Sequence, residues 1–284
     1  MRPGEGSTTA LYVAMGRAVA HAEGRVRGFS DPIARELLPP GARRLVDRFV
    51  AGEPPASLRD RARLAFVRRV VPLVSLRTIA IDDAIRGAAP VGQLVILGAG
   101  LDARAWRMAE LRDAIVFEVD HPATQAVKRE RTAGLARAAG EVRFVPVDFQ
   151  QDRLDAALAR AGHDAGVPSV FLWEGVVRYL TRAAIEATLD AVAARAAPGS
   201  RFVANYTAGG GGWRWVGNLG LRVIGEPTRS EHTSASIAAL LGARGFAVVS
   251  DTSALAWAEQ GDVPLGAGRR RWAESRRLIV AEGR

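Results

Sequence analysis

The sequence predicts an α/β protein in which an open, mostly parallel sheet follows an all-helical amino-terminal segment. Two short apolar runs, Leu94–Leu97 and Ile115–Val119, are rich in β-branched residues and have the composition of buried parallel strands. A glycine-bearing turn and a helical stretch separate them, which is the order expected of a doubly wound sheet. Strand and helix patterns then alternate to about residue 206. These observations together favour a Rossmann-like fold.

Residues 1–88 carry only helical patterns, and we expect them to form a helical cover or lid ahead of a core at 89–284. A first helix is expected from residue 8 or 9 to residue 20. Asp31 followed by Pro32 has the form of a second helix start, an N-cap with proline at the first helical position. Leu58–Arg86 is expected to be a long helix that is broken near Pro72. This segment either packs on the sheet as structure or folds over its carboxyl edge.

The turn between the first two strands predicts a nucleoside site. Gly98 and Gly100 let the backbone turn tightly and approach a ligand without a Cβ in the way. Asp120 ends the second strand twenty positions after Gly100, where a doubly wound fold places a carboxylate that binds both ribose hydroxyls. Asp102 stands in the turn, where it would repel a pyrophosphate but suit a cationic ligand. The combination favours S-adenosylmethionine over NAD; a purely structural turn is the alternative.

Two later strands are expected to end in the same crevice with acidic residues. Asp148 and Phe149 follow a strand at 143–147, where the carboxylate can accept a hydrogen bond from an adenine amino group and the ring can cover the base. The alternative is that Asp148 only caps the helix that follows. Glu174 follows the strand Ser169–Trp173, at the edge where open sheets bind ligands. Tyr179 comes shortly after it.

Beyond a fifth strand at 201–206, simple alternation ends. An insertion at about 207–245 contains a glycine run, Trp213 and Trp215, and a helix near 235–244. We expect substrate to be recognised here, with Tyr206 and the two tryptophans as candidate contacts; equally, the tryptophans can pack the insertion onto the core. The last strands, 246–251 and 277–281, are expected to form an antiparallel hairpin at the sheet edge. Helix signals are scarce in the link after Ala258.

Composition limits the function classes. The chain has 284 residues, of which 48% are hydrophobic, so it can bury a sizeable core. Its net charge is +9, but Lys128 is the only lysine, the arginines are interleaved with acids, and no basic run contains interleaved aromatic residues. We therefore expect no nucleic-acid partner. Without cysteine there is neither a disulfide nor thiolate chemistry, which fits a cytoplasmic protein.

A membrane partner is not expected either. No segment approaches the roughly twenty apolar residues of a membrane span. The apolar stretch at 10–20 is interrupted by Arg17 and does not make a convincing signal peptide. A homodimer is compatible with the sequence, which does not fix the oligomeric state.

The chain resembles the leucine carboxyl methyltransferase-like (PPM-type) family of class I S-adenosylmethionine-dependent methyltransferases. That family includes bacterial enzymes that methylate polyketide-type natural products. The matching segments follow the family's order between about residues 8 and 206: TTALYVAMGRA, DPIARELL, RTIAIDD, LGAGLDARAWRM, FEVDHPATQAVKRER, VPVDF and WEGVVRYL. The resemblance thins from the insertion onward, where GEPTRS and LLGARGF still match but the glycine–tryptophan stretch does not.

The resemblance implies a seven-stranded sheet with its last strand antiparallel, a helical amino-terminal cover, and S-adenosylmethionine as cofactor. By motif, Arg77 would hold the carboxylate of the cofactor's methionine end, Glu174 would face its amino group, and Asp120 would bind the ribose. Ala103 stands where many relatives carry threonine, a departure that should not affect binding. The motifs assign the following residues to the cofactor: Arg77, Gly98, Ala99, Gly100, Asp102, Asp120, His121, Asp148, Phe149 and Glu174.

The residues also bear on the acceptor. A carboxylate is already ionised at neutral pH, whereas a phenol, with a pKa of about 10, would benefit from a base. His121 belongs to the cofactor motif, and the contexts of His21, His163 and His232 do not mark a base. We therefore expect an S-adenosylmethionine-dependent O-methyltransferase of a small molecule, with carboxylate favoured over phenol. Arg17 and Tyr179 are candidates for orienting the acceptor. No metal-ligand spacing occurs, so no metal is expected.

Other functions remain open at this stage. A small-molecule N- or C-methyltransferase would use the same cofactor site. An NAD(P)-dependent reductase would share the turn and Asp120, but would not need Asp148 and Glu174, and Asp102 argues against it. A non-catalytic cofactor-binding module would bind the cofactor without turnover. An RNA or protein methyltransferase would suit the positive charge, yet no recognition appendage is visible.

Overall fold

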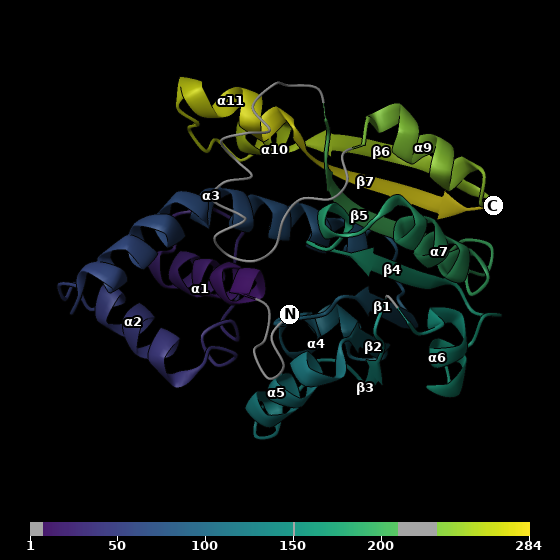
Figure 1. The fold of residues 1–284 in the computed structure, drawn as a ribbon, viewed down its shortest axis with the longest axis horizontal. Helices are drawn as coiled ribbons and strands as arrows, with labels where there is room; N and C mark the ends of the chain where they lie inside the picture. Colours follow the sequence, from purple (N-terminus) through teal and green to yellow (C-terminus); the bar gives the residue numbers. More distant parts are fainter. Residues whose placement is uncertain (1–7, 150, 210–231) are drawn as a thin grey trace.

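The computed structural model describes residues 8–149, 151–209 and 232–284 (Figure 1). Its centre is a seven-stranded sheet in the order β3-β2-β1-β4-β5-β7-β6. Strands β1 to β5 pair in parallel, and β7 runs antiparallel to both β5 and β6. The predicted sheet, with its last strand antiparallel, is therefore confirmed. The strands are β1 (Gln93–Leu97), β2 (Ile115–Asp120), β3 (Glu141–Pro146), β4 (Ser169–Trp173), β5 (Arg201–Thr207), β6 (Phe246–Ser253) and β7 (Arg276–Gly283).

The central strands are buried on both faces because helices cover the sheet from two sides. Every residue of β1 and β4 is buried. Leu94 and Ile96 face the core shared with the amino-terminal helices, whereas Val95 and Leu97 face the opposite core. This alternation is the two-residue period of a strand. Helices α6 (Leu154–Arg160), α7 (Arg182–Ala193) and α9 (Ser234–Gly242) contribute to the second core.

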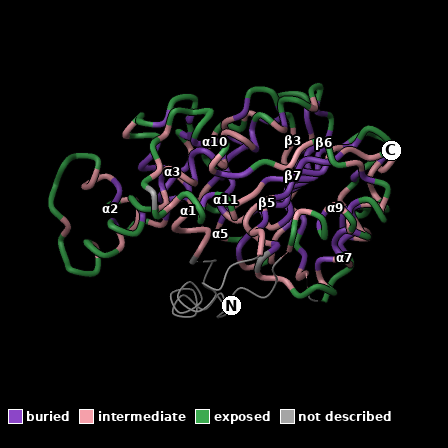
Figure 2. Tube along the Cα trace, turned by 90° about the horizontal axis from the view of Figure 1, so that it is seen from above, coloured by how far each residue is buried: buried purple, intermediate pink, exposed green. Residues whose placement is uncertain are grey.

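Three helices form the amino-terminal segment: α1 (Thr8–Glu23), α2 (Pro40–Val50) and α3 (Leu58–Arg86). They lie to the left of the sheet in Figure 1. The loop that joins α2 to α3, residues 51–57, is exposed except at Pro55 and is drawn mostly in green in Figure 2. Helix α3 also contacts α10 (Ala254–Gln260) and β7, so this segment packs against the end of the sheet where the last strands lie.

Two expectations for this segment were wrong. Asp31 does not begin an α-helix: its carboxylate accepts the Ala34 N–H at 2.9 Å, but the residues that follow form turns, and α2 begins only at Pro40. Helix α3 is not broken at Pro72 but continues for 29 residues. A proline removes one backbone hydrogen bond, and the buried face of α3 supplies enough packing to offset that loss.

Three further boundaries differ from the sequence-based expectations. The helix after the glycine turn, α4 (Arg104–Arg107), is a single turn, and a 3-10 turn at Ala109–Leu111 follows it. Helix α5 (Pro122–Thr132) follows β2, where the sequence pattern suggests a helix from residue 122 to about residue 139; it ends earlier, next to Gly134, whose flexibility disfavours helix. The link after Ala258, where helix signals are scarce, nevertheless contains a second helix, α11 (Ala267–Glu274), beside α10.

Helix α5 is joined to β2 by a buried ion pair. The Nζ of Lys128 lies 2.6 Å from Oε1 of Glu118, and both side chains are 1% exposed. The Trp106 ring covers the ammonium group, with its centroid 5.1 Å away. Burial raises the pKa of Glu118 to about 7 despite the opposing charge of Lys128. The chain's only lysine is therefore enclosed between a strand, a helix and an indole ring.

The described helices do not include one with the length and apolarity needed to cross a membrane. Residues 210–231 lie outside the described part of the chain, and the predicted substrate contacts Trp213 and Trp215 fall among them. The 3-10 turn Val177–Tyr179 follows β4 and completes the elements near the carboxyl edge of the sheet.

Candidate functional site

The glycine turn after β1 lies at the carboxyl edge of the sheet and is fixed by backbone hydrogen bonds. Gly98 has φ +71° and Gly100 has φ +48°, a left-handed conformation that favours glycine. The Gly98 N–H donates to the Val119 carbonyl at 2.8 Å, which joins the turn to β2. A Cβ on Gly98 would collide with the side chain of Val176, and one on Gly100 would lie 3.3 Å from Ala10 of α1. The turn is therefore closely covered on two sides.

Asp120, at the end of β2, holds the glycine turn through its carboxylate. One oxygen accepts the Gly100 N–H at 2.5 Å and the other accepts the His121 N–H at 2.6 Å. Burial raises the pKa of Asp120, and these two hydrogen bonds oppose that shift. Each carboxylate oxygen has a second lone pair, so the group can accept further hydrogen bonds from a ligand. His121 caps α5, and its Nδ1 accepts the Ala123 N–H at 3.2 Å.

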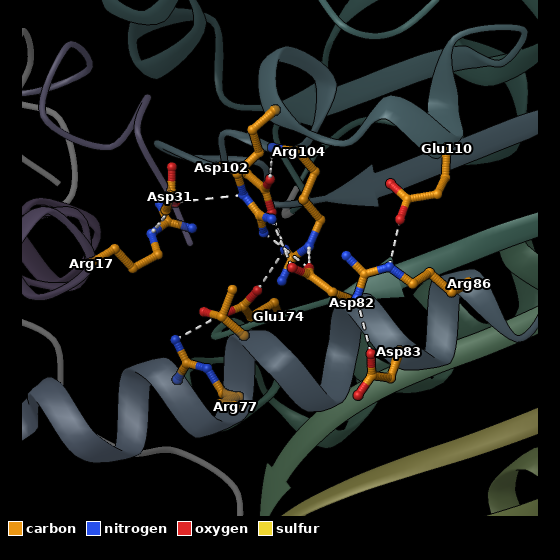
Figure 3. A network of polar contacts seen from close by, with 12 residues as sticks. Arg17, Asp31, Arg77, Asp82, Asp83, Arg86, Asp102, Arg104, Glu110 and Glu174 are labelled. Carbon is orange, nitrogen blue, oxygen red and sulfur yellow. Dashed lines mark hydrogen bonds and ion pairs between the residues drawn. The ribbon is translucent and has the colours of Figure 1, made fainter. Parts of the chain in front are cut away.

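A network of buried charges lies beside this turn (Figure 3). Its cations and anions are equal in number, so its formal charges cancel. It joins the amino-terminal helices to the glycine turn and to the end of β4. The members of this charge network are Arg17, Arg77, Arg104, Arg107, Asp31, Asp82, Asp102 and Glu174.

Glu174 is bound by two arginines in the charge network. Its Oε1 lies 2.7 Å from Nη2 of Arg77, on α3, and its Oε2 lies 2.8 Å from Nη1 of Arg104, on α4. The side chains of Glu174 and Arg77 are 10% and 14% exposed, so water screens the pair little. Burial raises the pKa of Glu174, but the charges of Arg77 and Arg104 outweigh burial and hold it at about 2. Glu174 is ionised at neutral pH.

Asp102 is turned into the charge network rather than outward from the glycine turn. It accepts the backbone N–H of Arg104 at 2.8 Å and forms an ion pair with the Arg104 guanidinium. Burial raises its pKa, but the charges of Arg104, Arg17 and Lys128 outweigh burial and hold the pKa of Asp102 well below its usual range. The carboxylate that the sequence places in the turn is therefore ionised and neutralised by arginine.

The predicted acceptor-orienting residues lie where α1 meets the site. Arg17 is 3% exposed; it donates to the Leu101 carbonyl, next to Gly100, and lies 3.4 Å from Asp31. Its guanidinium thus ties α1 to the glycine turn. The Tyr179 hydroxyl lies 3.5 Å from Oγ1 of Thr9, at the start of α1. Orientation of an acceptor by either side chain stays a prediction.

The predicted adenine contacts lie beyond the end of β3. Asp148 and Phe149 are half-buried, and Phe149 packs against the second core. Oδ2 of Asp148 accepts a hydrogen bond from the side chain of Gln151 at 2.9 Å, and its backbone N–H donates to Asp152. Asp148 does not cap α6, whose N-cap is Arg153, so the alternative explanation of this residue is wrong.

Tyr206, predicted as a substrate contact, is 3% exposed and engaged by neighbouring strands. Its hydroxyl donates to Asp251 at 2.6 Å and lies 2.9 Å from Ser234. Burial and the hydrogen bond to Asp251 raise the pKa of Tyr206 to about 12. Asp251 is held in turn by Arg277 at 2.9 Å. This arrangement fastens the start of α9, within the insertion, to the sheet.

Sequence reasoning missed four members of the charge network: Asp31, which was expected to start a helix, and Asp82, Arg104 and Arg107. Arg104 is fully buried, and Arg107 and Asp82 are 5% and 7% exposed. The available signal was their position: charged residues inside segments that carry the family motifs, next to apolar residues expected to be buried. Among the described residues, no three His, Cys, Asp or Glu side chains cluster in a way that could hold a metal ion.

Comparison with known proteins decides the family. The family model described as leucine carboxyl methyltransferase matches residues 10–193, more than half of the chain. The chain belongs to the leucine carboxyl methyltransferase family. The matched range of this family contains the glycine turn, the charge network and Tyr179, and it ends before the insertion.

Curated relatives support the same family. A protein of Mycolicibacterium gilvum is 37% identical over 204 residues, covering 71% of this chain and 66% of the relative. A protein of Mycobacterium tuberculosis is 38% identical over 198 residues, covering 68% of this chain and 64% of the relative. Both bear a provisional name, S-adenosyl-L-methionine-dependent methyltransferase. The chain spans about two thirds of the length of these relatives.

Solved structures show the fold. A geranyl diphosphate methyltransferase bound to S-adenosylmethionine matches with a TM-score of 0.53 at 16% identity, covering 81% of this chain and 92% of that protein. The geranyl diphosphate C-methyltransferase of Streptomyces coelicolor matches with a TM-score of 0.50 at 13% identity, covering 81% and 85%. With the seven-stranded sheet, these matches identify a class I methyltransferase fold.

Proposed function

We propose that the protein is an S-adenosylmethionine-dependent methyltransferase that methylates an oxygen, preferably a carboxylate oxygen, of a small molecule. The observation that carries this proposal is the pairing of Arg77 with Glu174 at 2.7 Å, beside the glycine turn and Asp120. The methionine end of the cofactor is a zwitterion. Its carboxylate suits Arg77 and its ammonium suits Glu174, so the two ends can replace the contact that these side chains make with each other.

The nucleoside end would occupy the adjacent part of the carboxyl edge. Asp120 would bind the ribose hydroxyls through the lone pairs that the backbone N–H groups leave available. Asp148 and Phe149, at the end of the neighbouring strand β3, would receive the adenine ring. Asp102, neutralised by Arg104, would line the methionine end without adding a net negative charge.

When bound, S-adenosylmethionine supplies a methyl group on a sulfonium, a good leaving group for in-line displacement. The protein's contribution is then mainly alignment, for which effective molarities of about 10⁵ M or more are available in favourable cases. A carboxylate acceptor needs no base. His163 contacts Ser169 at the amino end of β4, the opposite edge from Glu174, and is not placed to serve as one. We assign orientation of the acceptor to Tyr179 and Arg17.

The test is calorimetric titration with S-adenosylhomocysteine, with NAD(H) as a control ligand. We expect micromolar binding of S-adenosylhomocysteine by the wild type and at least a roughly tenfold loss in Asp120→Ala, because charge-assisted hydrogen bonds to the ribose disappear. Asp113→Ala is the matched control: Asp113 lies just before β2, its side chain is 88% exposed, and the variant should bind S-adenosylhomocysteine as the wild type does. Failure to bind S-adenosylhomocysteine, or binding of NAD(H) in its place, would contradict the proposal.

A further inference from the structure

Arg104 is the member of the charge network that touches the most carboxylates. Its side chain is fully buried, and it reaches three anions from three separate segments. Nε lies 2.8 Å from Asp82 on α3, and Nη1 lies 2.8 Å from Glu174 after β4 and also pairs with Asp102 in the glycine turn. Figure 3 shows these side chains converging on the guanidinium. A planar fork of this kind fixes the direction of each partner, which a single ammonium cannot do.

Binding of a zwitterion between Arg77 and Glu174 would separate these two side chains. Oε1 of Glu174 would turn from Arg77 to the ligand's ammonium, whereas Oε2 would stay on Arg104. We propose that Arg104 is a positioning residue that holds Glu174 and Asp102 in place for the ammonium group and so sets affinity for the amino-acid end of the cofactor. This inference rests on the proposed function. The nucleoside end of the cofactor would still be bound by Asp120, Asp148 and Phe149, which Arg104 does not contact in the described part of the chain.

The charges around Glu174 explain why such a residue is needed. Arg77 faces it from α3, Arg104 from α4, Asp102 from the glycine turn and Arg17 from α1. When Arg77 turns to the ligand's carboxylate, Arg104 is the remaining arginine in direct contact with Glu174 in the described part of the chain. Without it, Glu174 and Asp102 would repel each other in a buried site, and Glu174 would take up a proton more readily.

Arg107 provides a matched control. It lies on the same single-turn helix, is 5% exposed, and binds Asp82 through two nitrogens at 2.7 and 2.9 Å and Asp31 at 3.7 Å. Within the described residues it contacts neither Asp102 nor Glu174. Loss of Arg107 therefore disturbs the same buried network without touching the carboxylates that we assign to the ammonium.

The experiment compares two ligands on the full chain. S-adenosylhomocysteine carries the amino-acid end, and 5′-methylthioadenosine has the same nucleoside and thioether without it. We expect Arg104→Gln to weaken S-adenosylhomocysteine about 30-fold and 5′-methylthioadenosine less than about threefold, as measured by calorimetry. Arg104→Lys should recover part of the loss, because it restores the charge but not the fork. Arg107→Gln should change the two affinities by the same factor.

A second readout separates positioning from a general structural role. In Arg104→Gln, affinity for S-adenosylhomocysteine should fall more steeply than in the wild type as pH is lowered from about 7 to about 5, because Glu174 then lacks one of the two arginines that contact it and lower its pKa. Equal weakening of both ligands, or an unchanged S-adenosylhomocysteine affinity, would overturn the inference. If Arg104→Gln does not fold, Arg104→Lys carries the same comparison. A wild type that binds neither ligand contradicts the proposed function itself.

Discussion

Replacing Glu174 by glutamine should destabilise the ligand-free protein measurably. The pKa of Glu174 is held at about 2, against an ordinary value of 4.5, by Arg77 and Arg104 acting against burial. One pKa unit corresponds to about 1.4 kcal/mol, so the ionised side chain contributes on the order of 3 kcal/mol to the free energy of unfolding. Removal of one partner from a buried ion pair typically costs about 3–5 kcal/mol, which agrees with this value.

The dependence on pH has a definite sign. Because the pKa in the folded protein is lowered, the stabilisation is fully present above pH 4.5 and is lost as pH falls toward 2. The difference between wild type and Glu174→Gln should therefore be constant from about pH 8 to pH 5, and should shrink by about 1 kcal/mol at about pH 3.5.

Urea unfolding followed by far-UV circular dichroism measures this difference. Glu110→Gln is the matched control: Glu110 pairs with Arg86 at 2.6 Å, but its side chain is 38% exposed, and surface pairs contribute about 1 kcal/mol or less. A Glu174→Gln variant no less stable than Glu110→Gln at neutral pH would refute the reasoning. So would a difference that does not shrink in acid.

Two further predictions concern the amino-terminal helices. Arg17→Ala should lower the free energy of unfolding, measured in urea, by about 2–4 kcal/mol, because the buried Asp31 loses one of its two arginine partners. A loss below about 1 kcal/mol would contradict a structural role for Arg17. An unchanged KM for the acceptor and an unchanged kcat would remove its predicted role in orienting the acceptor. Pro72→Ala should raise the free energy of unfolding by about 1–2 kcal/mol, because the backbone hydrogen bond that α3 regains outweighs the conformational freedom that the unfolded chain gains. A lower melting temperature would show instead that the proline ring supplies packing that alanine cannot replace.

The sequence allowed the centre of the fold to be predicted because the evidence there is local. Apolar runs of strand length, two glycines and Asp120 lie close together in the chain, and each has one dominant structural explanation. The structure confirms the strands β1 and β2, the left-handed glycines and the antiparallel β7.

The incorrect predictions have a common cause in tertiary packing. A proline signals a helix break, yet Pro72 lies in a helix whose buried face holds it in place. Asp31 carries the signal of an N-cap, but its carboxylate is held among Arg17, Arg107 and a turn rather than at a helix start. No local pattern reports such partners, because they come from segments far apart in the chain.

The charge network shows the same limit at the site. Arg77 and Glu174 were found through motifs, but their direct contact was not predictable, since 97 positions separate them in the chain. Arg104 carries no sequence signal of its burial, because arginine is most often a surface residue. Its burial follows only from the meeting of α3, α4 and the end of β4.

The enclosure of Lys128 has a practical consequence for chemistry at the surface. As the only lysine in the chain, and only 1% exposed, it leaves the folded protein without an accessible side-chain amine. Amine-directed cross-linkers should therefore find no reactive lysine on the folded chain. Acylation of the lysine would then require β2 and α5 to part, so the appearance of a label at Lys128 would report the opening of the fold at this one position.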